Sequence, residues 1–329
     1  MSFKRMNRSM FLTCVATMAA LHMGAGEAAA QGYPSKLVRI IVPSSPGGAS
    51  DLVARIVAAS LAETLGQPFI VENRVTSGGI LGTQQAAQSA PDGHTLLVTF
   101  DTFVLNSFLF RNLQWDPIRD FAPIMQVSRY PQVLLVHPSL GVRTVKEFVA
   151  LSKQKGGALN YGSPGPASSS RLAYELFKDV AGIETVAIHY KGGGPAMQSL
   201  ISGQVQVMLV QGGGTIQQNV KAGKLIALAV SSLTRTPLHA ELPTIAETYP
   251  GFETQSWVGM LAPAATPKPV IDRLHAVLAQ ILAGPGMKER FESQGAEIVA
   301  GTPEALARQM KEDQEKWGKI IRDKKIAAD

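Results

Sequence analysis

One pattern constrains the fold of this chain more than any other: short apolar runs alternate with helical patterns, and the turns between them are rich in glycine. In the first example, residues 37–42 predict a buried strand, a Pro/Gly loop follows, and a helical pattern opens at Ser50 or Asp51. A strand, a glycine turn and a helix N-terminus form the anion site of many open α/β sheets. A plain turn with a capping serine has the same pattern, so this stretch alone leaves both interpretations open.

The alternation continues and predicts a parallel, doubly wound α/β architecture. Strands are expected at residues 69–72 and 95–100, with a helix at 80–90 between them. Short turns from strand to helix are typical of parallel sheets. The second run of the pattern comprises helices at 145–153, 168–181, 195–202 and 215–221 and strands at 159–162, 186–190, 205–210 and 225–231.

Two extended segments separate these runs. Residues 121–136 contain two prolines and are too long for one ordinary strand, so we interpret them as a passage between two lobes. Residues 254–262 have the pattern of a return strand, and the chain beyond them is predicted to be helical. The predicted lobes are therefore residues 31–131 plus 254–329 and residues 132–253, with a cleft between them.

The N-terminus has the features of a secretory signal peptide. Lys4, Arg5 and Arg8 form a basic region, a short apolar stretch follows, and residues 28–30 match an A-x-A cleavage site. A membrane anchor is the alternative, but the apolar stretch contains His22 and is short for a bilayer span. Residues 1–30 are therefore predicted to be cleaved, which predicts export to the periplasm.

Composition excludes several classes of site. Cys14, in the predicted leader, is the only cysteine of the sequence, so the mature chain would have no disulfide, thiolate nucleophile or cysteine-ligated metal. The formal net charge is +6, of which the leader contributes +2, and the basic residues are scattered. A mature charge of +4 without a basic stripe argues against a nucleic-acid partner.

Glycine-rich loops recur at one structural position, after a predicted strand and before a predicted helix. Because ligands bind at the carboxyl ends of strands in open α/β sheets, two facing lobes would bring several of these loops to one cleft. No lysine or arginine lies between Pro43 and Asp51, so the predicted anion site uses neutral donors. The loops comprise Pro46-Gly47-Gly48, Gly78-Gly79, residues 162–170, Gly192-Gly193-Gly194 and Gly212-Gly213-Gly214.

Standard enzymatic signatures are absent from the sequence. There is no G-x-S-x-G, no phosphate-binding G-x-x-x-x-G-K-[ST], no G-x-G-x-x-G and no H-E-x-x-H. The five histidines after the leader are widely separated and are interpreted as structural or surface residues. We therefore assign no catalytic residue, no metal ligand and no cofactor.

Two charged residues stand out. Asp101 ends a predicted strand, where it either accepts a hydrogen bond from a ligand or caps the next helix. Arg171 lies in the first turn of a predicted helix, against the dipole preference, and either pairs with a ligand carboxylate or lies at the surface. The sequence leaves both pairs of alternatives open.

Short motifs are spread over essentially the whole chain after the leader. They are Tyr33-Pro34-Ser35-Lys36, Val42-Pro43-x-x-Pro46-Gly47-Gly48-x-x-Asp51, Val71-Glu72-Asn73-Arg74, Gly78-Gly79-x-x-Gly82-Thr83, Ala90-Pro91-Asp92-Gly93-x-Thr95-Leu96, Asp116-Pro117-x-x-Asp120-Phe121-Ala122-Pro123, Tyr190-Lys191-Gly192-Gly193-Gly194-Pro195-Ala196, Lys221-Ala222-Gly223-Lys224-Leu225 and Gln294-Gly295-Ala296-Glu297. With this highly specific combination, the chain resembles the Bug/TctC family of periplasmic solute receptors, the extracytoplasmic binding components of tripartite tricarboxylate transporters.

The resemblance implies a two-lobed periplasmic-binding-protein fold, or Venus flytrap, with a mostly parallel sheet flanked by helices in each lobe. It also implies a monomeric receptor, not an enzyme, that closes on a small organic acid and works with membrane permease subunits. Residues 44–51 and 163–170 would hold the carboxylate, mostly through backbone groups, hydroxyls and ordered waters. The candidate ligand-binding residues are Ser44, Ser45, Gly47, Gly48, Ser50, Asp51, Gly79, Asp101, Ser163, Gly165, Ser168, Ser169, Arg171, Gly193 and Gln211.

Several positions depart from the family pattern, so the identity of the acid stays open. Ser44 stands where an aromatic residue is usual, Arg171 replaces a common histidine, and Gln211-Gly212 replaces an acidic residue followed by asparagine. Di- and tricarboxylates, aromatic carboxylates and amino-acid-like acids all stay candidates. The alternative functions are a ligand sensor for a signalling partner such as a sensor kinase, and an exported hydrolase that uses Asp101 with a distant histidine.

Overall fold

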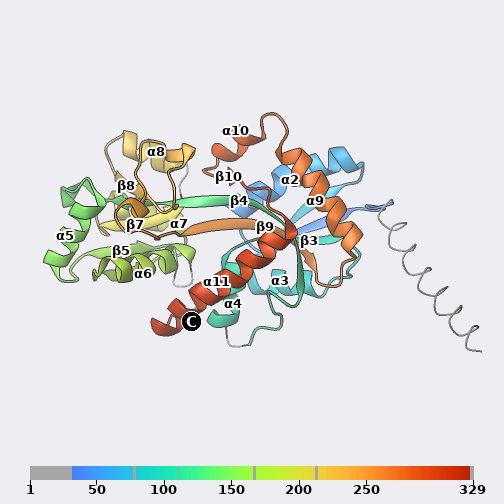
Figure 1. Cartoon of the computed structure of the whole chain (residues 1–329), viewed down its shortest axis with the longest axis horizontal. Coiled ribbons are helices and arrows are strands. Elements are labelled where there is room, and N and C mark those ends of the chain that lie inside the picture. The colour runs from blue at the N-terminus through green and yellow to red at the C-terminus, as the bar shows by residue number, and fades with distance from the viewer. Residues whose placement is uncertain (1–31, 77–78, 111, 166–167, 212–213, 327–329) are drawn as a thin grey trace, which may run out of the picture.

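The computed structural model describes residues 32–76, 79–110, 112–165, 168–211 and 214–326, so the predicted signal peptide lies outside the described residues. The strand–helix alternation predicted from the sequence is present throughout (Figure 1). The strands are β1 (Val38–Val42), β2 (Phe69–Asn73), β3 (Thr95–Phe100), β4 (Phe121–Val136), β5 (Asn160–Ser163), β6 (Val186–His189), β7 (Val207–Gln211), β8 (Ile226–Val230), β9 (Gln255–Pro263) and β10 (Glu297–Ile298). The α-helices are α2 (Ala49–Leu65), α3 (Ile80–Ala87), α4 (Thr102–Leu109), α5 (Val145–Lys155), α6 (Ser169–Ala181), α7 (Gly193–Ile201), α8 (Gly214–Lys221), α9 (Lys268–Leu282), α10 (Met287–Glu292) and α11 (Pro303–Asp323). Short 3-10 helices lie at Pro138–Leu140, Pro237–His239 and Ile245–Glu247.

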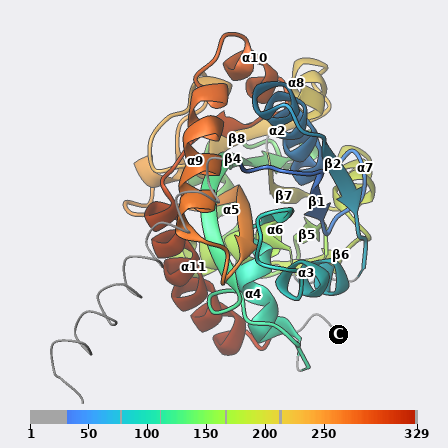
Figure 2. The ribbon, with the colours of Figure 1, turned by 90° about the vertical axis from the view of Figure 1, so that its right-hand side faces the viewer.

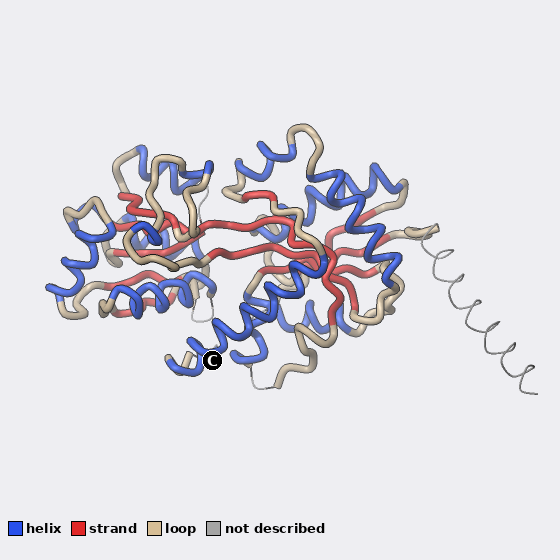
Figure 3. The backbone as a smooth tube through the Cα atoms, viewed as in Figure 1, coloured by secondary structure: helices blue, strands red, loops and turns tan. Residues whose placement is uncertain are grey.

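The described strands form one mixed sheet, whose path runs β2-β1-β3-β9-β4-β7-β5-β6, with β8 and β10 paired to β4 beside that path. At one end β1 is parallel to β2 and β3, and at the other end β5 is parallel to β6 and β7. Between these ends, β9 is antiparallel to both β3 and β4. Each end therefore has the parallel order that the alternation predicts, and antiparallel strands join the two ends (Figure 3).

The long strand β4 runs through both ends of the molecule as one continuous strand of 16 residues. It pairs with β9 as far as Pro131, and from Gln132 onward it pairs with β7 and β8. The expectation that this stretch is too long for one strand is wrong, because register shifts at residues 123/125 and 126/128 absorb its length. A bulge tolerates a residue without an N–H, such as Pro123. The lobe boundaries at 131/132 and 253/254 stay a prediction.

Helices cover both faces of the sheet at each end (Figure 2). Around β1–β3, α2 and α9 bury one face through Val57 and Leu278, and α4 buries the opposite face through Phe103. At the other end, α5 and α6 pack against the sheet through Phe148 and Phe177. These two groups of helices leave the carboxyl ends of the parallel strands facing each other across the middle of the molecule (Figure 1).

The C-terminal helix α11 connects the two ends. Its residues Leu306, Met310, Trp317 and Ile320, predicted as a core face from their helical spacing, are buried in one cluster with residues of α4 and α6. No helix in the described part of the chain combines the length and apolarity needed to cross a membrane.

One short element differs from the sequence prediction. The region before α11 was expected to be helical throughout, but β10 pairs antiparallel with Ser128 and Arg129 of β4. The guanidinium of Arg129 also lies 2.7 Å from the carboxylate of Glu297 in β10. A two-residue strand is fixed by its partner strand and is too short to show a periodic pattern, so β10 could not be predicted from the local sequence.

Candidate ligand-binding site

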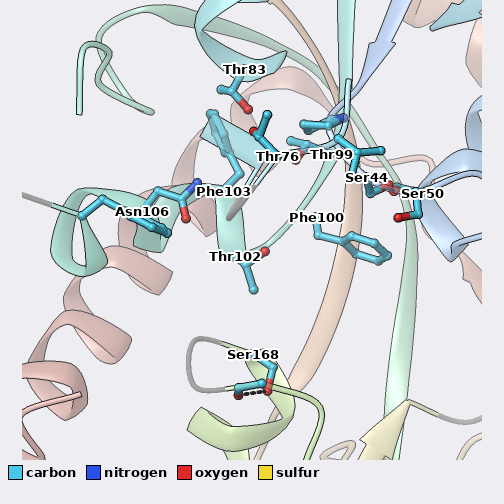
Figure 4. Close-up of a pocket in the computed structure, with 16 residues that line it drawn as sticks. Ser44, Ser50, Thr76, Thr83, Thr99, Phe100, Thr102, Phe103, Asn106 and Ser168 are labelled. Atoms are coloured by element: carbon cyan, nitrogen blue, oxygen red, sulfur yellow. Dashed lines mark hydrogen bonds between the residues drawn. The ribbon is translucent and has the colours of Figure 1, made fainter. Parts of the chain in front are cut away.

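A cavity of about 420 Å³ lies where the carboxyl ends of four strands come together. The segments that follow β1, β2 and β3 line one side, and the segment that follows β5 lines the other (Figure 4). This is the position at which ligands bind in open α/β sheets. The lining residues are Pro43, Ser44, Ser45, Ser50, Val75, Thr76, Gly79, Thr83, Thr99, Phe100, Thr102, Phe103, Asn106, Phe110, Gly165 and Ser168.

The loop after β1 is held in shape by its own polar groups. Gly47 has a φ of +79°, which favours glycine, and its N–H donates to Asp51 Oδ2 over 2.9 Å. The hydroxyl oxygens of Ser44 and Ser50 lie 2.7 Å apart, and the Asn73 amide donates to the Ser44 carbonyl over 3.0 Å. Ser44 and Ser50 therefore line the cavity from a loop that several hydrogen bonds fix (Figure 4).

Asp51 anchors this loop from behind the cavity. It is buried, and its carboxylate accepts hydrogen bonds from the Gly47 N–H, from Asn73 Nδ2 at 2.9 Å and from Arg55 Nε at 3.0 Å. Burial by itself would raise the pKa of Asp51, but the hydrogen bonds from Arg55, Gly47 and Asn73 outweigh it and hold that pKa below its ordinary value. Asp51 is not among the lining residues, so its charge organises the loop without facing the cavity.

Helix α3 begins directly against the first loop. Gly79 lines the cavity with a φ of +69°, and a Cβ added there would come within 2.8 Å of both the Cβ and the carbonyl oxygen of Pro43. Only glycine allows the start of α3 to approach Pro43 this closely. Thr76 and Thr83, on either side of this contact in sequence, add hydroxyl groups to the lining (Figure 4).

The end of β3 and the helix α4 also line the cavity, and sequence reasoning missed them. They contribute Thr99, Phe100, Thr102, Phe103, Asn106 and Phe110. Two signals were available: the carboxyl-end rule applies to β3 as it does to β1, and Asn106 is a polar residue inside an apolar helical run. The ring of Phe103 stacks on Trp115 with 5.3 Å between centroids, which fixes α4 to the core beneath the cavity.

Asp101 lies between two lining residues in sequence, but its carboxylate is directed to β9. It is buried, it caps α4 by accepting from the Thr102 N–H at 2.9 Å, and it accepts from Ser256 Oγ at 2.9 Å. Burial raises the pKa of Asp101 to about 8, and the nearby carboxylate of Asp313 adds to the rise. Of the two alternatives from the sequence, the structure contains the helix cap, and a ligand contact by Asp101 stays a prediction that this orientation does not favour.

The described part of the loop after β5 is held by hydroxyl groups. The hydroxyls of Ser163 and Ser168 both donate to the Gly165 carbonyl, over 2.7 and 2.9 Å. Ser168 Oγ also accepts from the Arg171 N–H at 3.3 Å and so caps α6. Gly165 and Ser168 line the cavity, whereas Ser163 is buried behind them.

The other predicted site residues lie outside the lining. Gly48 precedes α2, Ser169 begins α6, Gly193 is exposed at the start of α7, and Gln211 ends β7. Arg171 lies in the first turn of α6. Burial of His189 and, to a lesser degree, the positive charge of Arg171 lower the pKa of His189. Ligand contacts by these residues stay predictions. The predicted residues that do not line the cavity are Gly47, Gly48, Asp51, Asp101, Ser163, Ser169, Arg171, Gly193 and Gln211.

The described residues that line the cavity carry no formal charge. Their polar groups are hydroxyls, one side-chain amide and the backbone, and the helices α2, α3 and α6 begin at the edge of the cavity. Helix N-termini attract negative charge, so this arrangement can bind an anion through neutral donors. Over the described residues, no group of three or more His, Cys, Asp or Glu side chains is placed to hold a metal ion.

Sequence comparison links the chain to known receptors. Residues 53–326 match the family described as "Tripartite tricarboxylate transporter family receptor". The chain is 35% identical over 298 residues to the "UPF0065 protein in tcbD-tcbE intergenic region" of Pseudomonas sp. (strain P51), which covers 90% of this chain and 88% of that protein. It is 30% identical over 321 residues to "Protein BugT" of Bordetella pertussis, and this match covers 97% of this chain and 98% of that protein.

Solved structures share the fold. Rpa4515 of R. palustris with adipate has a TM-score of 0.79 and 32% identity, and the match covers 90% of this chain and 99% of that one. MatC (Rpa3494) from Rhodopseudomonas palustris with bound malate has a TM-score of 0.74 and 30% identity, and the match covers 88% of this chain and 100% of that one. Periplasmic binding protein BugD has a TM-score of 0.74 and 34% identity, and the match covers 90% of this chain and 99% of that one. The predicted two-lobed periplasmic-binding-protein fold is therefore confirmed.

Proposed function

Because the chain belongs to the tripartite tricarboxylate transporter receptor family, we propose that it is a periplasmic receptor that captures a small organic acid and delivers it to membrane permease subunits. The family consists of solute-binding receptors, and two relatives hold adipate and malate in their structures. We also propose that residues 1–30 are removed on export. In this proposal the mature protein acts as a monomer and catalyses no reaction.

The observation that carries the proposal is the uncharged cavity of hydroxyls and backbone donors at the carboxyl ends of β1, β2, β3 and β5. A carboxylate there would accept hydrogen bonds from amides of the loop after β1 and from one of the Ser44 and Ser50 hydroxyls, whichever does not donate to the other. The N-termini of α2 and α3 would stabilise its charge. With no fixed cation in the described lining, the site gains affinity from the number and placement of its donors and from bridging waters.

The lining residues also support capture by closure. Gly165 and Ser168 come from the end of the molecule opposite to the other lining residues, and β4 and β9 join the two ends. A ligand that contacts both sides favours the conformation in which they are close, and it shifts the population toward that conformation by its difference in affinity. The closed form would be the one that a membrane partner recognises.

A screen of organic acids by thermal unfolding tests the proposal. An acid present at 100 times its Kd should stabilise the protein by about 2.7 kcal/mol. Ser50→Ala should reduce this gain, because Ser50 lines the cavity. Ser60→Ala is the matched control, since Ser60 lies further along α2 and its hydroxyl donates to the Ile56 carbonyl. If no mono-, di- or tricarboxylate stabilises the protein, the proposed function is wrong.

A ligand sensor and a transport receptor could bind the acid in the same cavity, and they would differ in the membrane partner that they act on. Deletion of the gene should abolish uptake of the radiolabelled acid if the protein is a transport receptor. Unchanged uptake, together with an altered transcriptional response to the acid, would instead support a ligand sensor.

A further inference from the structure

We propose that the segment after α11 fixes the spacing between the two ends of the molecule and in this way sets the affinity for the acid. This segment, the α11 tail, comprises Lys324, Lys325 and Ile326. The described lining of the cavity does not include these residues, so they are positioning residues that act through α6. The inference rests on the proposed function, because it concerns the affinity of the same cavity.

Two helices contribute to the cavity from opposite ends of the molecule, and α11 packs on both of them. Thr102 and Asn106 line the cavity from α4, and Ser168, which caps α6, lines it from the β5 side. Figure 1 shows α11 running from the end that contains α4 toward the end that contains α6, and it contacts both helices. Displacements pass between distant groups through packed side chains and rigid helices, so the packing of α11 influences the spacing of the two sides of the cavity.

The last turns of α11 hold a defined place on α4. A Cβ added at Gly318 would come within 2.7 Å of the Phe108 ring, so the glycine allows the two helices to approach closely. The guanidinium carbon of Arg322 lies 5.6 Å from the centroid of the same ring, in a cation–π contact. The residues that follow Arg322 are therefore presented to α6 from a fixed position.

Helix α6 belongs to two apolar clusters at once. Tyr174 and Phe177 are buried in the core of the end that contains β5, whereas Leu172 is buried in the cluster formed by α4 and α11. Leu172 lies in the first turn of α6, and its N–H donates to the Ser168 carbonyl over 3.2 Å. A movement of α11 against α6 would thus reach a residue that lines the cavity through a single helical turn.

The α11 tail makes a polar contact with α6. The Lys324 ammonium donates to the carboxylate of Asp179, and the two side chains are 34% and 47% exposed. The pKa of Lys324 is raised, mainly by this hydrogen bond and also by the negative charges of Glu175 and Glu184. An ion pair of this exposure contributes little to overall stability, but it joins two helices that belong to different ends of the molecule.

The backbone of the tail directs its last described side chain into the core. The N–H of Lys325 donates to the Arg322 carbonyl and the N–H of Ile326 to the Ile321 carbonyl, over 3.2 and 2.9 Å, which is the pattern of a Schellman motif. Lys325 has a φ of +50°, an unfavourable value for a residue with a Cβ. Ile326 is buried in the same cluster as Leu172, and this burial offsets the strain at Lys325.

The distance between the two ends can be measured without a ligand. Fluorescent labels at Glu63→Cys in α2 and Lys155→Cys in α5 report it, because both positions are exposed and Cys14, the only cysteine of the sequence, lies in the predicted leader. Lys324→Asp should broaden the distance distribution in single-molecule energy transfer, since it replaces the attraction to Asp179 by repulsion. A distribution identical to that of the wild type would overturn the inference.

Titration with the most stabilising acid of the thermal screen measures the effect on affinity. Lys324→Asp and Ile326→Ala should each raise the apparent Kd by about three- to tenfold, because that Kd rises as the binding-competent fraction falls. The double variant Lys324→Asp/Asp179→Lys should return to within about twofold of the wild type, since it restores the pair with its charges exchanged. Lys319→Ala is the matched control, because Lys319 pairs with Asp323 of the same helix, and it should leave the Kd unchanged.

The possible results separate this inference from the receptor function. Wild-type affinity in Lys324→Asp, or no recovery in the double variant, would overturn the role of the tail and leave the receptor function intact. If no acid binds the wild type, the receptor function is wrong, and the label distances alone then decide whether the tail fixes the spacing of the two ends.

Discussion

Asp51 and Asp101 occupy similar places in the fold and have opposite electrostatics. Each follows a parallel strand, lies at the start of a helix, and is buried beside residues that line the cavity. Asp51 accepts from an exposed guanidinium, a backbone amide and a side-chain amide, and its pKa is lowered. Asp101 accepts from two neutral donors, lies near the carboxylate of Asp313, and has a pKa raised to about 8.

This difference shows that its partners, more than its position, set the protonation state of a buried carboxylate at the start of a helix. The loop after β1 relies on a charged anchor, because it has no core side chain of its own at Ser44 to Gly48. The turn after β3 relies on core packing instead, because Phe103 is stacked on Trp115 directly after it. The ionised form of Asp51 therefore stabilises the fold, and the ionised form of Asp101 destabilises it.

The largest expected effect is on the pH dependence of stability, through Asp101→Asn. The folded pKa of about 8 lies above the unfolded value near 4, so the folded state binds the extra proton and Asp101 weakens the fold as pH rises between these values. From pH 5 to pH 9 this group should lower the free energy of unfolding by about 4 kcal/mol in the wild type. Asp101→Asn should remove that decrease, since both hydrogen bonds use Oδ1, which asparagine retains.

Urea unfolding at pH 5 and pH 9 measures this difference. Asp272→Asn is the control, because Asp272 is exposed and pairs with Lys268 at the surface of α9. If wild type and Asp101→Asn show parallel pH profiles, Asp101 is ionised in the fold with an ordinary pKa, and the contrast with Asp51 disappears.

The second expected effect is a loss of stability and affinity in Asp51→Ala. The substitution leaves the Gly47 N–H and one N–H of the Asn73 amide without an acceptor, while the Asn73 amide still donates to the Ser44 carbonyl. This loss should cost about 3 kcal/mol. The ion pair contributes little to this figure, because the Arg55 side chain is half exposed. Ligand affinity should fall as well, since the loop that carries Ser44 and Ser50 loses its anchor. Chemical unfolding and titration with the identified acid measure the two losses.

Asp51→Asn separates the anchor from its charge. Asparagine keeps one accepting oxygen, which can still accept from the Gly47 N–H and from Arg55, so its loss of stability should be less than half that of Asp51→Ala. The contribution of Asp51 should also vanish in acid: its folded pKa is lowered, so the stability it provides is present at neutral pH and is lost as pH falls through that pKa. Full affinity in Asp51→Ala would show that the loop keeps its shape without this carboxylate.

Much of the fold could be predicted from the sequence, because periodicity and glycine turns are local signals. The helix α11, with Leu306 and Trp317 on one face, and the strand β3 are examples. The length of β4 could not be predicted, since bulges depend on the partner strand. The ends of the predicted strands indicated where the cavity lies. They could not show that the Asp101 carboxylate is directed away from it, because that orientation depends on a hydrogen bond from Ser256, 155 residues away in sequence.

The smallest expected effect concerns the helix start on the opposite side of the cavity, where the cap is neutral. Ser168→Ala removes the acceptor of the Arg171 N–H, and loss of such a cap costs about 1 kcal/mol. Thr144→Ala is the matched control, because Thr144 caps α5 with a capping box and is not among the residues that line the cavity. Both variants should lose similar stability, but only Ser168→Ala should weaken ligand binding, since Ser168 lines the cavity. If Thr144→Ala weakens binding equally, the lost affinity reflects the lower stability of the end of the molecule that contains β5, and not a lost contact between Ser168 and the ligand. The neutral cap at Ser168 would then differ from the charged anchor at Asp51 only in how much it stabilises the fold.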